Sequence, residues 1–223
     1  MKSLLLAVLA LTGQDGGRID LAPWKLTLPV GDGGRAREIL PAELATFSID
    51  PWFRRLPDGL AFRAPVEGAV TKGSSYPRSE LREHGAAWST SEGVHQMTIR
   101  QAILKTPSKK PHVVAGQIHD AKDDVVMIRL EGKRLFVEGG GKDLGLLEAD
   151  YALGTEFVVR LVASAGRIRV YYRDLETPKV DVARRAEGCY FKAGVYTQSN
   201  LAKGDAAGEY GEVVIRELTL AHR

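Results

Sequence analysis

The chain has 223 residues, of which 44% are hydrophobic and 26% are charged, as in a folded globular protein rather than a disordered one. Its 31 basic and 28 acidic residues leave a net charge of only +3, with no dense run of lysine or arginine, so a nucleic-acid partner is not expected. The single cysteine, Cys189, excludes an internal disulfide and a cysteine-based metal site, and it is expected to be a small buried residue.

The first residues predict a short secretory signal. Lys2 supplies a positive start, residues 4–11 form an apolar run, and small residues follow at Thr12 and Gly13. The run is too short to span a bilayer, and the polar, glycine-rich residues 13–18 favour a processed terminus over a buried first strand. We therefore expect a signal peptide over residues 1–16, a single catalytic domain over residues 17–223, export to the periplasm or the medium, and no membrane contact after processing.

The rest of the chain predicts many short strands. In chain order they cover residues 24–28, 60–62, 78–82, 94–103, 113–119, 125–130, 135–138, 156–163, 167–172, 190–198 and 213–220. A helical turn is expected from Pro41, a hairpin turn at 131–133, a loop over 31–40 and a flexible insertion over 139–143. No segment has a sustained helical period. The pattern predicts an all-β jelly-roll sandwich of two antiparallel sheets with a concave substrate groove.

The strand predicted at 190–198 has one apolar and one polar face, because side chains alternate along a strand. The apolar face consists of Phe191, Ala193, Val195 and Thr197. The polar face consists of Tyr190, Lys192, Gly194, Tyr196 and Gln198. A glycine in the middle of such a face allows a close approach to the backbone. The polar face is therefore expected to form part of the floor of a groove.

Two other predicted strands are built in the same way. One carries Arg78, Glu80 and Arg82 on a single face, and the other carries Gln117 and His119 on either side of the inward-pointing Ile118. We expect these segments to lie beside the strand at 190–198 in one sheet and to share one polar face.

This set of side chains favours elimination over hydrolysis. Glycoside hydrolysis normally needs two facing carboxylates, but the shared face offers only Glu80, whose pKa the flanking Arg78 and Arg82 are expected to lower. Arginine and amide groups can instead stabilise a substrate carboxylate while a proton is removed beside it. A histidine or tyrosine can take that proton, and a tyrosine can protonate the departing oxygen. This β-elimination requires no metal and no cofactor.

The three segments resemble the signature blocks of the alginate lyases of polysaccharide lyase family 7, in order and in approximate spacing. The blocks are Arg-Ser-Glu-Leu-Arg at 78–82, Gln-Ile-His at 117–119 and Tyr-Phe-Lys-Ala-Gly-Val-Tyr-Thr-Gln at 190–198, and residues 24–29 are similar to the opening strand of the family. The resemblance implies a β-jelly roll whose partner is alginate, an anionic polysaccharide of mannuronate and guluronate. We expect the protein to be a monomer, although the sequence itself leaves the oligomeric state open.

The resemblance also implies roles for individual residues. Arg78, Gln117 and His119 would neutralise the substrate carboxylate, His119 or Tyr196 would remove the C5 proton, and Tyr196 would be the general acid. The groove would be shaped, and neighbouring sugars held, by Glu80, Arg82, Lys192 and Gln198. Ile118 is associated in the family with cleavage of guluronate-containing stretches. Thr197 replaces the usual asparagine, and since it faces the core it is expected to alter packing more than chemistry.

Other interpretations remain open at this stage. The charged strand residues could form a solvated ladder, His119 could be structural, Tyr190 is assigned mainly to a half-buried sheet position, and Lys192 could be a surface charge. The other four histidines have no evident partners. A non-catalytic carbohydrate-binding jelly roll, or a lyase acting on another uronan such as glucuronan, are the alternative functions.

Overall fold

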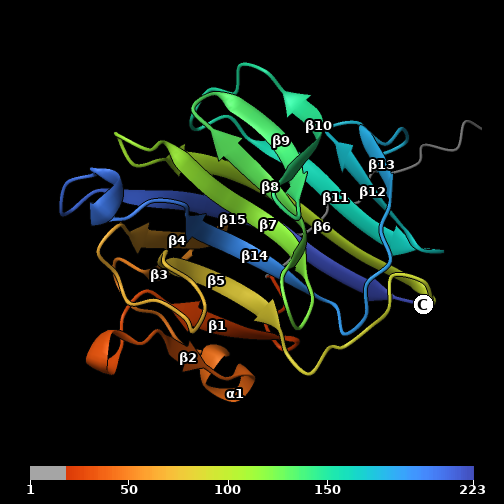
Figure 1. Cartoon of the computed structure of the whole chain (residues 1–223). Coiled ribbons are helices and arrows are strands. Elements are labelled where there is room, and N and C mark those ends of the chain that lie inside the picture. The colour runs from red at the N-terminus through yellow and green to blue at the C-terminus, as the bar shows by residue number, and fades with distance from the viewer. Residues whose placement is uncertain (1–18) are drawn as a thin grey trace, which may run out of the picture.

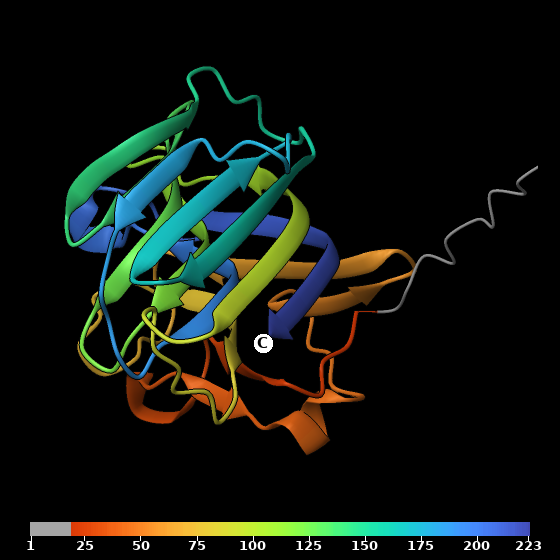
Figure 2. The same ribbon diagram turned by 90° about the vertical axis from the view of Figure 1, so that its right-hand side faces the viewer.

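Two antiparallel β-sheets pack face to face in the computed structural model, which describes residues 19–223 (Figures 1 and 2). This arrangement confirms the predicted all-β sandwich. The expected signal peptide, residues 1–16, lies outside the described residues. None of the helices in the described part of the chain is long and apolar enough to cross a membrane.

One sheet has eight strands and carries all three of the polar segments. In spatial order its strands are β10 (Lys142–Glu148), β9 (Arg134–Gly139), β8 (Asp124–Glu131), β7 (His112–His119), β14 (Tyr190–Thr197), β5 (Arg78–Glu83), β1 (Trp24–Leu28) and β2 (Arg37–Ile39) (Figure 1). β14 therefore lies between β7 and β5, as the alternation of polar and apolar residues predicts.

The second sheet has seven strands and lies behind the first in Figure 1. Its strands, in spatial order, are β13 (Val180–Ala183), β12 (Arg167–Tyr172), β11 (Phe157–Ser164), β6 (Val94–Lys105), β15 (Tyr210–His222), β4 (Gly59–Pro65) and β3 (Phe53–Leu56). The only α-helix in the described residues is the single turn α1 (Pro41–Leu44), with 3-10 turns at Asp32–Gly34 and Leu201–Lys203.

The core lies between the sheets and is lined by the apolar residues of each strand. Phe191, Ile118 and Leu81 of the eight-stranded sheet are fully buried together with Phe62 of the other sheet. Thr197 is also fully buried, and its hydroxyl donates a hydrogen bond to the carbonyl of Ala64 in β4 (2.9 Å). The expectation that Thr197 faces the core is therefore confirmed, and its hydroxyl links the two sheets.

Four strands were not predicted, and each is the edge of a sheet. β2 lies in the expected loop over 31–40, β10 begins in the expected flexible insertion, and β3 and β13 end the second sheet. Edge strands are short and half solvated, so their sequences lack the clear alternation of central strands. Residues 139–143 were wrongly predicted as a flexible insertion, because Gly140 and Gly141 form the tight turn between β9 and β10.

Candidate active site

A groove with a volume of about 580 Å³ crosses the outer face of the eight-stranded sheet. Its lining residues come from β2, β1, β5, β14, β7, β8 and β9, and from the loops around residues 71–74 and 121–123. Seven of the eight predicted site residues line it: Arg78, Arg82, Gln117, His119, Lys192, Tyr196 and Gln198. The predicted convergence of three distant segments is thus present in the structure.

Strand pairing brings these side chains together. Lys192 on β14 is in register with Arg82 on β5 and with Gln117 on β7. In the same strand, Tyr196 is paired with Arg78 and Tyr190 with His119. Cross-strand partners lie about 5 Å apart in an antiparallel sheet. The register of the three strands therefore places these side chains next to one another.

Gly194 makes the close contact between β14 and β5 possible. Its φ of +137° is rarely adopted by residues with a side chain, and a Cβ atom there would lie 2.5 Å from the carbonyl oxygen of Ser79 and 2.9 Å from the Cα of Glu80. The approach predicted at this glycine is therefore made by the neighbouring strand of the same chain.

Glu80 lies beneath the groove rather than on its surface. Its side chain is 0% exposed and accepts hydrogen bonds from Nζ of Lys192 (2.6 Å), from a guanidinium nitrogen of Arg78 (3.1 Å) and from the amide of Gln117. The expectation that Glu80 holds a sugar does not fit this position, because the carboxylate is covered by its three partners. Glu80 instead holds the donors that line the groove.

The ionisation of Glu80 and Lys192 follows from their contact in a buried site. Burial alone would raise the pKa of Glu80, but the charges of Lys192 and Arg78 outweigh it and hold the pKa below its usual value. Burial lowers the pKa of Lys192 to about 8, despite the opposing attraction of Glu80. Near pH 7 the cluster therefore consists of one carboxylate beneath cationic groups.

His119 is a neutral imidazole with one nitrogen available to accept a proton. Burial lowers its pKa, with the positive charge of Lys192 adding to the effect. Its Nδ1 lies 2.6 Å from the carbonyl oxygen of Asp120, which can only accept a hydrogen bond, so Nδ1 carries the hydrogen. Nε2 then carries the lone pair and has no hydrogen-bond partner within residues 19–223.

Tyr196 and Arg78 are in direct contact in the groove. The guanidinium carbon of Arg78 lies 3.7 Å from the centre of the Tyr196 ring, which fixes the ring by a cation–π contact. The Tyr196 hydroxyl lies 2.9 Å from the hydroxyl of Ser74 in the loop before β5. Arg78 is 7% exposed, and its Nε has no hydrogen-bond partner among the described residues.

Tyr190 contributes more to the site than the sequence indicated. Its ring is stacked on His119, with the ring centres 5.4 Å apart, and its hydroxyl lies 3.1 Å from Nδ1 of that histidine. Arg82 covers the ring, with its guanidinium carbon 3.9 Å from the ring centre. Tyr190 shares a strand face with Lys192, and this pattern could have identified it as a residue that positions His119.

The groove has a surplus of positive charge. Six cationic residues line it, namely Lys72, Arg78, Arg82, Lys122, Arg129 and Lys192. Four acidic residues also line it, namely Glu38, Asp123, Asp124 and Glu138. Lys72, Arg82 and Lys122 form no ion pair with any described residue. The rim residues Lys72, Ser74 and Lys122 were missed because the sequence gives no strand pattern in loops.

Two histidines outside the groove have partners that the sequence did not reveal. Nδ1 of His95 lies 2.8 Å from Nδ1 of His222, whose Nε2 lies 2.7 Å from a carboxylate oxygen of Glu83. His95 is also stacked on Trp88, with the ring centres 4.5 Å apart. These contacts join the ends of β6 and β15 to the ends of β5 and β14, so the two histidines are structural. Cys189 is buried and free, as expected.

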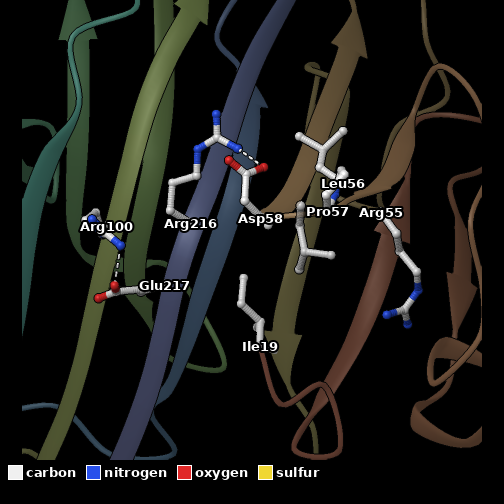
Figure 3. A pocket seen from close by; sticks show the side chains of 10 residues that line it. Ile19, Arg55, Leu56, Pro57, Asp58, Arg100, Arg216 and Glu217 are labelled. Atoms are coloured by element: carbon white, nitrogen blue, oxygen red, sulfur yellow. Dashed lines mark hydrogen bonds and ion pairs between the residues drawn. The ribbon is translucent and has the colours of Figure 1, made fainter. Parts of the chain in front are cut away.

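A second hollow, the outer pocket, lies on the seven-stranded sheet and has a volume of about 440 Å³. Arg100, Arg216 and Glu217 project into it from β6 and β15, and Asp58 faces them from the turn before β4 (Figure 3). Arg216 is paired with Asp58, and Arg100 with Glu217. Both arginines also lie near Glu156 (3.4 and 3.9 Å). The third cation of the outer pocket, Arg55, donates hydrogen bonds to backbone carbonyls, so every cation there already has protein acceptors. No group of three or more metal-ligating side chains occurs within residues 19–223.

A jelly-roll sheet with a cationic groove, in which an arginine, a glutamine, a histidine and a tyrosine converge, defines a polysaccharide lyase acting on a carboxylated polymer. Residues 19–222 match the family model described as Alginate lyase (Alginate_lyase2). The chain belongs to this family, the alginate lyases of polysaccharide lyase family 7, and is an alginate lyase. This membership supports alginate lyase activity rather than non-catalytic carbohydrate binding.

Solved structures and a curated relative agree with the family assignment. Alginate lyase AlgAT5 of polysaccharide lyase family 7 is 49% identical, with a TM-score of 0.88 over 92% of this chain and 96% of that one. The alginate lyase from Corynebacterium sp. is 41% identical, with a TM-score of 0.87 and the same coverage of both chains. An alginate lyase of Klebsiella pneumoniae is 25% identical over 281 residues, covering 93% of this chain and 91% of the relative.

Proposed function

We propose that the chain cleaves alginate by β-elimination, with His119 as the base and Tyr196 as the acid. Nε2 of His119 would take the proton from C5 of a uronate, while the Tyr196 hydroxyl would give its proton to the glycosidic oxygen as the C4–O bond breaks. The result is a double bond between C4 and C5 and a free hydroxyl on the leaving sugar. The neutral state of His119, with its lone pair on Nε2, supports this division of roles.

The substrate carboxylate would be held by Arg78 and Gln117. Removing a proton beside a carboxylate builds negative charge on it, and fixed donors in a partly dry site stabilise that charge strongly. Both donors are already fixed, because each also bonds to the buried Glu80. Arg82, Lys192 and Gln198 would contact neighbouring sugars. The surplus of positive charge in a groove lined by seven strands is the observation on which the proposal rests.

The test is ultraviolet absorbance during incubation with alginate, since elimination creates a conjugated double bond. Absorbance should rise with wild type and stay flat with Tyr196→Phe and with His119→Ala, while circular dichroism shows that both variants remain folded. If either variant keeps nearly full activity, the role assigned to that residue is wrong.

A preference for guluronate-containing stretches is the finer part of the proposal. Ile118 is fully buried on the core side of β7, between Gln117 and His119, and we infer that its size influences how these two side chains are presented to the groove. Separate polyguluronate and polymannuronate polymers test the preference. A higher kcat/KM on polyguluronate, reduced in Ile118→Val, is the expected result, and equal values on both polymers would contradict it.

The proposed reaction needs no metal, because Arg78 and Gln117 supply the positive charge and hydrogen bonds that a cation would otherwise supply to the carboxylate. Activity should therefore be unchanged after dialysis against a chelator. A loss of activity that added metal restores would contradict this part of the proposal.

We also infer that the enzyme is exported and monomeric. The positive, apolar and small-residue pattern of residues 1–16 supports export. We expect protein from the culture medium or periplasm to have a mature N-terminus near residue 17. Size-exclusion chromatography with light scattering should give the mass of one chain. An uncleaved cytoplasmic chain, or a stable dimer, would contradict them.

A further inference from the structure

The hydroxyl of Ser74 is the only side-chain hydrogen-bond partner of the Tyr196 hydroxyl within residues 19–223. The two oxygens lie 2.9 Å apart. Ser74 belongs to the loop between β4 and β5, at the rim of the groove, and it lies outside the three sequence blocks that define the site. The contact therefore joins the proposed general acid to a residue that has no assigned role.

The hydrogen bonds of Ser74 show which of the two hydroxyls is the donor. Ser74 Oγ donates to the carbonyl oxygen of Tyr76 (3.0 Å) and accepts from the backbone N–H of Tyr76 (3.1 Å). A serine hydroxyl has one hydrogen to give and two lone pairs. Its hydrogen is used on a carbonyl, which can only accept, so Tyr196 is the donor in the remaining bond. In the resting enzyme, the Tyr196 hydroxyl therefore keeps its proton and donates it in a hydrogen bond to Ser74 Oγ.

The loop holds Ser74 in place from both sides. The backbone N–H of Ser74 donates to the carbonyl of Thr71 (3.0 Å), and the side-chain amide of Asn200 donates to the carbonyl of Ser75 (3.0 Å). Nζ of Lys110 lies 3.2 Å from the hydroxyl of Tyr76. Since Arg78 also packs against the Tyr196 ring, the distance between the two hydroxyls is set by the fold.

We propose that Ser74 is a positioning residue that holds the Tyr196 proton before the reaction and stabilises the phenolate after it. This inference rests on the proposed role of Tyr196 as general acid. When the C4–O bond breaks, the Tyr196 hydroxyl turns from Ser74 to the glycosidic oxygen and gives up its proton. Ser74 then redirects its own O–H from the carbonyl of Tyr76 to the phenolate oxygen. The proton taken from C5 by His119 returns to Tyr196 through solvent, so the cycle balances.

A pair of adjacent serines provides a matched test. Ser74→Ala removes the partner of Tyr196, whereas Ser75→Ala changes an exposed side chain for which no hydrogen bond is found. For Ser74→Ala, kcat should fall on the order of tenfold with KM nearly unchanged, because the lost contact is with Tyr196 and not with a sugar. Ser75→Ala should match wild type, and Ser74→Thr, which keeps the hydroxyl, should recover most of the lost kcat.

The results of these experiments distinguish a failure of the role proposed for Ser74 from a failure of the role proposed for Tyr196. If Tyr196→Phe is inactive but Ser74→Ala has wild-type kcat, the role of Ser74 is wrong and that of Tyr196 survives. If Tyr196→Phe is itself active, the acid assignment fails first. Equal losses in Ser74→Ala and Ser75→Ala, or a loss in KM alone, would mean that the loop only shapes the groove, and this too overturns the inference. Thermal unfolding of each variant shows that it is folded.

Discussion

The groove and the outer pocket are built from the same kinds of charged residues, yet only one is suited to bind a polyanion. In the groove, Arg78 and Lys192 are almost fully buried and share one carboxylate, Glu80, which lies beneath them. In the outer pocket, Arg100 and Arg216 are more exposed, and their carboxylate partners Glu217, Asp58 and Glu156 lie at the surface. The number of arginines is therefore a poor guide to function.

The difference lies in burial and in the ratio of charges. Exposed pairs are screened by water and contribute about 0–1 kcal/mol each. Every cation of the outer pocket has protein acceptors, whereas Lys72, Arg82 and Lys122 of the groove form no ion pair with the described residues. A buried carboxylate that serves several cations orients them while leaving a net positive charge on the side that faces the groove. An anionic polymer gains from that field, whereas it gains little from the outer pocket.

The largest expected effect is the loss of the proposed base. Removal of a general base or acid costs about 10²–10⁴-fold in rate, so His119→Ala and Tyr196→Phe should each reduce kcat by about 10³-fold. Arg216→Ala in the outer pocket is the control and should leave kcat unchanged. Similar losses in Arg216→Ala and His119→Ala would break the distinction between the two regions.

A large effect is also expected for Glu80→Gln, although Glu80 touches no substrate. The change leaves Arg78 and Lys192 without their buried counter-charge, so the free energy of unfolding should fall by about 3 kcal/mol, as in other broken buried pairs. The rate should fall as well, because Gln117 and Arg78 lose a fixed orientation. Glu217→Gln is the matched control, with an expected change below about 0.5 kcal/mol. If urea titrations give the two variants the same free energy of unfolding, the buried Glu80 does not stabilise the fold as proposed.

The alkaline pH range tests Lys192. Because its folded-state pKa is about 8 and its usual value is 10.5, Lys192 loses its charge in the folded enzyme first. Activity should decline above pH 8 as the groove loses positive charge. Between pH 8 and 10.5 the unfolded chain binds the extra proton, so the contribution of Lys192 to the free energy of unfolding rises with pH.

As the pH rises from 8 to 10.5, activity should therefore fall while the contribution of Lys192 to the free energy of unfolding rises. The measurement is the pH dependence of thermal unfolding and of turnover in wild type, compared with Lys192→Met. If the difference in stability between the two proteins does not change between pH 8 and 10.5, the buried lysine does not titrate as expected.

The acid range tests His119. Burial lowers its pKa below the usual value of 6.5, so the neutral base should persist, and activity should be retained, somewhat below pH 6.5. The unfolded chain takes up a proton at this position first, so the contribution of His119 to stability falls as the pH drops through 6.5. An acid limb of the kcat/KM profile centred well above pH 6.5 would contradict this.

The smallest effect is expected at the rim. Lys122 is exposed, lines the groove and forms no ion pair among the described residues, whereas Lys133, also exposed, is paired with Asp150 and does not line the groove. Lys122→Ala should raise KM for alginate about threefold at low salt, with less effect at high salt, because exposed charges are screened. Lys133→Ala should leave KM unchanged at either salt concentration.

The sequence predicted the central strands and the groove residues because both depend on alternation. Residues 78–82, 117–119 and 190–198 each have one polar and one apolar face, and paired strands align such faces directly. The edge strands β2, β3, β10 and β13 were missed because one side of each is solvated and alternation is weak.

The burial of individual strand residues and the contacts made by loops could not be predicted from alternation. Glu80 has the same sequence pattern as Arg78 and Arg82, and only the contacts of Lys192 and Gln117 show that it is covered. The contact of Ser74 with Tyr196 joins residues 122 positions apart, through a loop that has no repeating pattern. Local sequence periodicity carries no information on either point.

The most direct test of the account is a crystal structure of Tyr196→Phe with an alginate oligosaccharide bound. We expect one uronate carboxylate to contact Arg78 and Gln117, with its C5 within reach of Nε2 of His119 and its glycosidic oxygen beside the ring of residue 196. An oligosaccharide bound along the groove with its carboxylates turned away from Arg78, or bound at the outer pocket, would contradict the account.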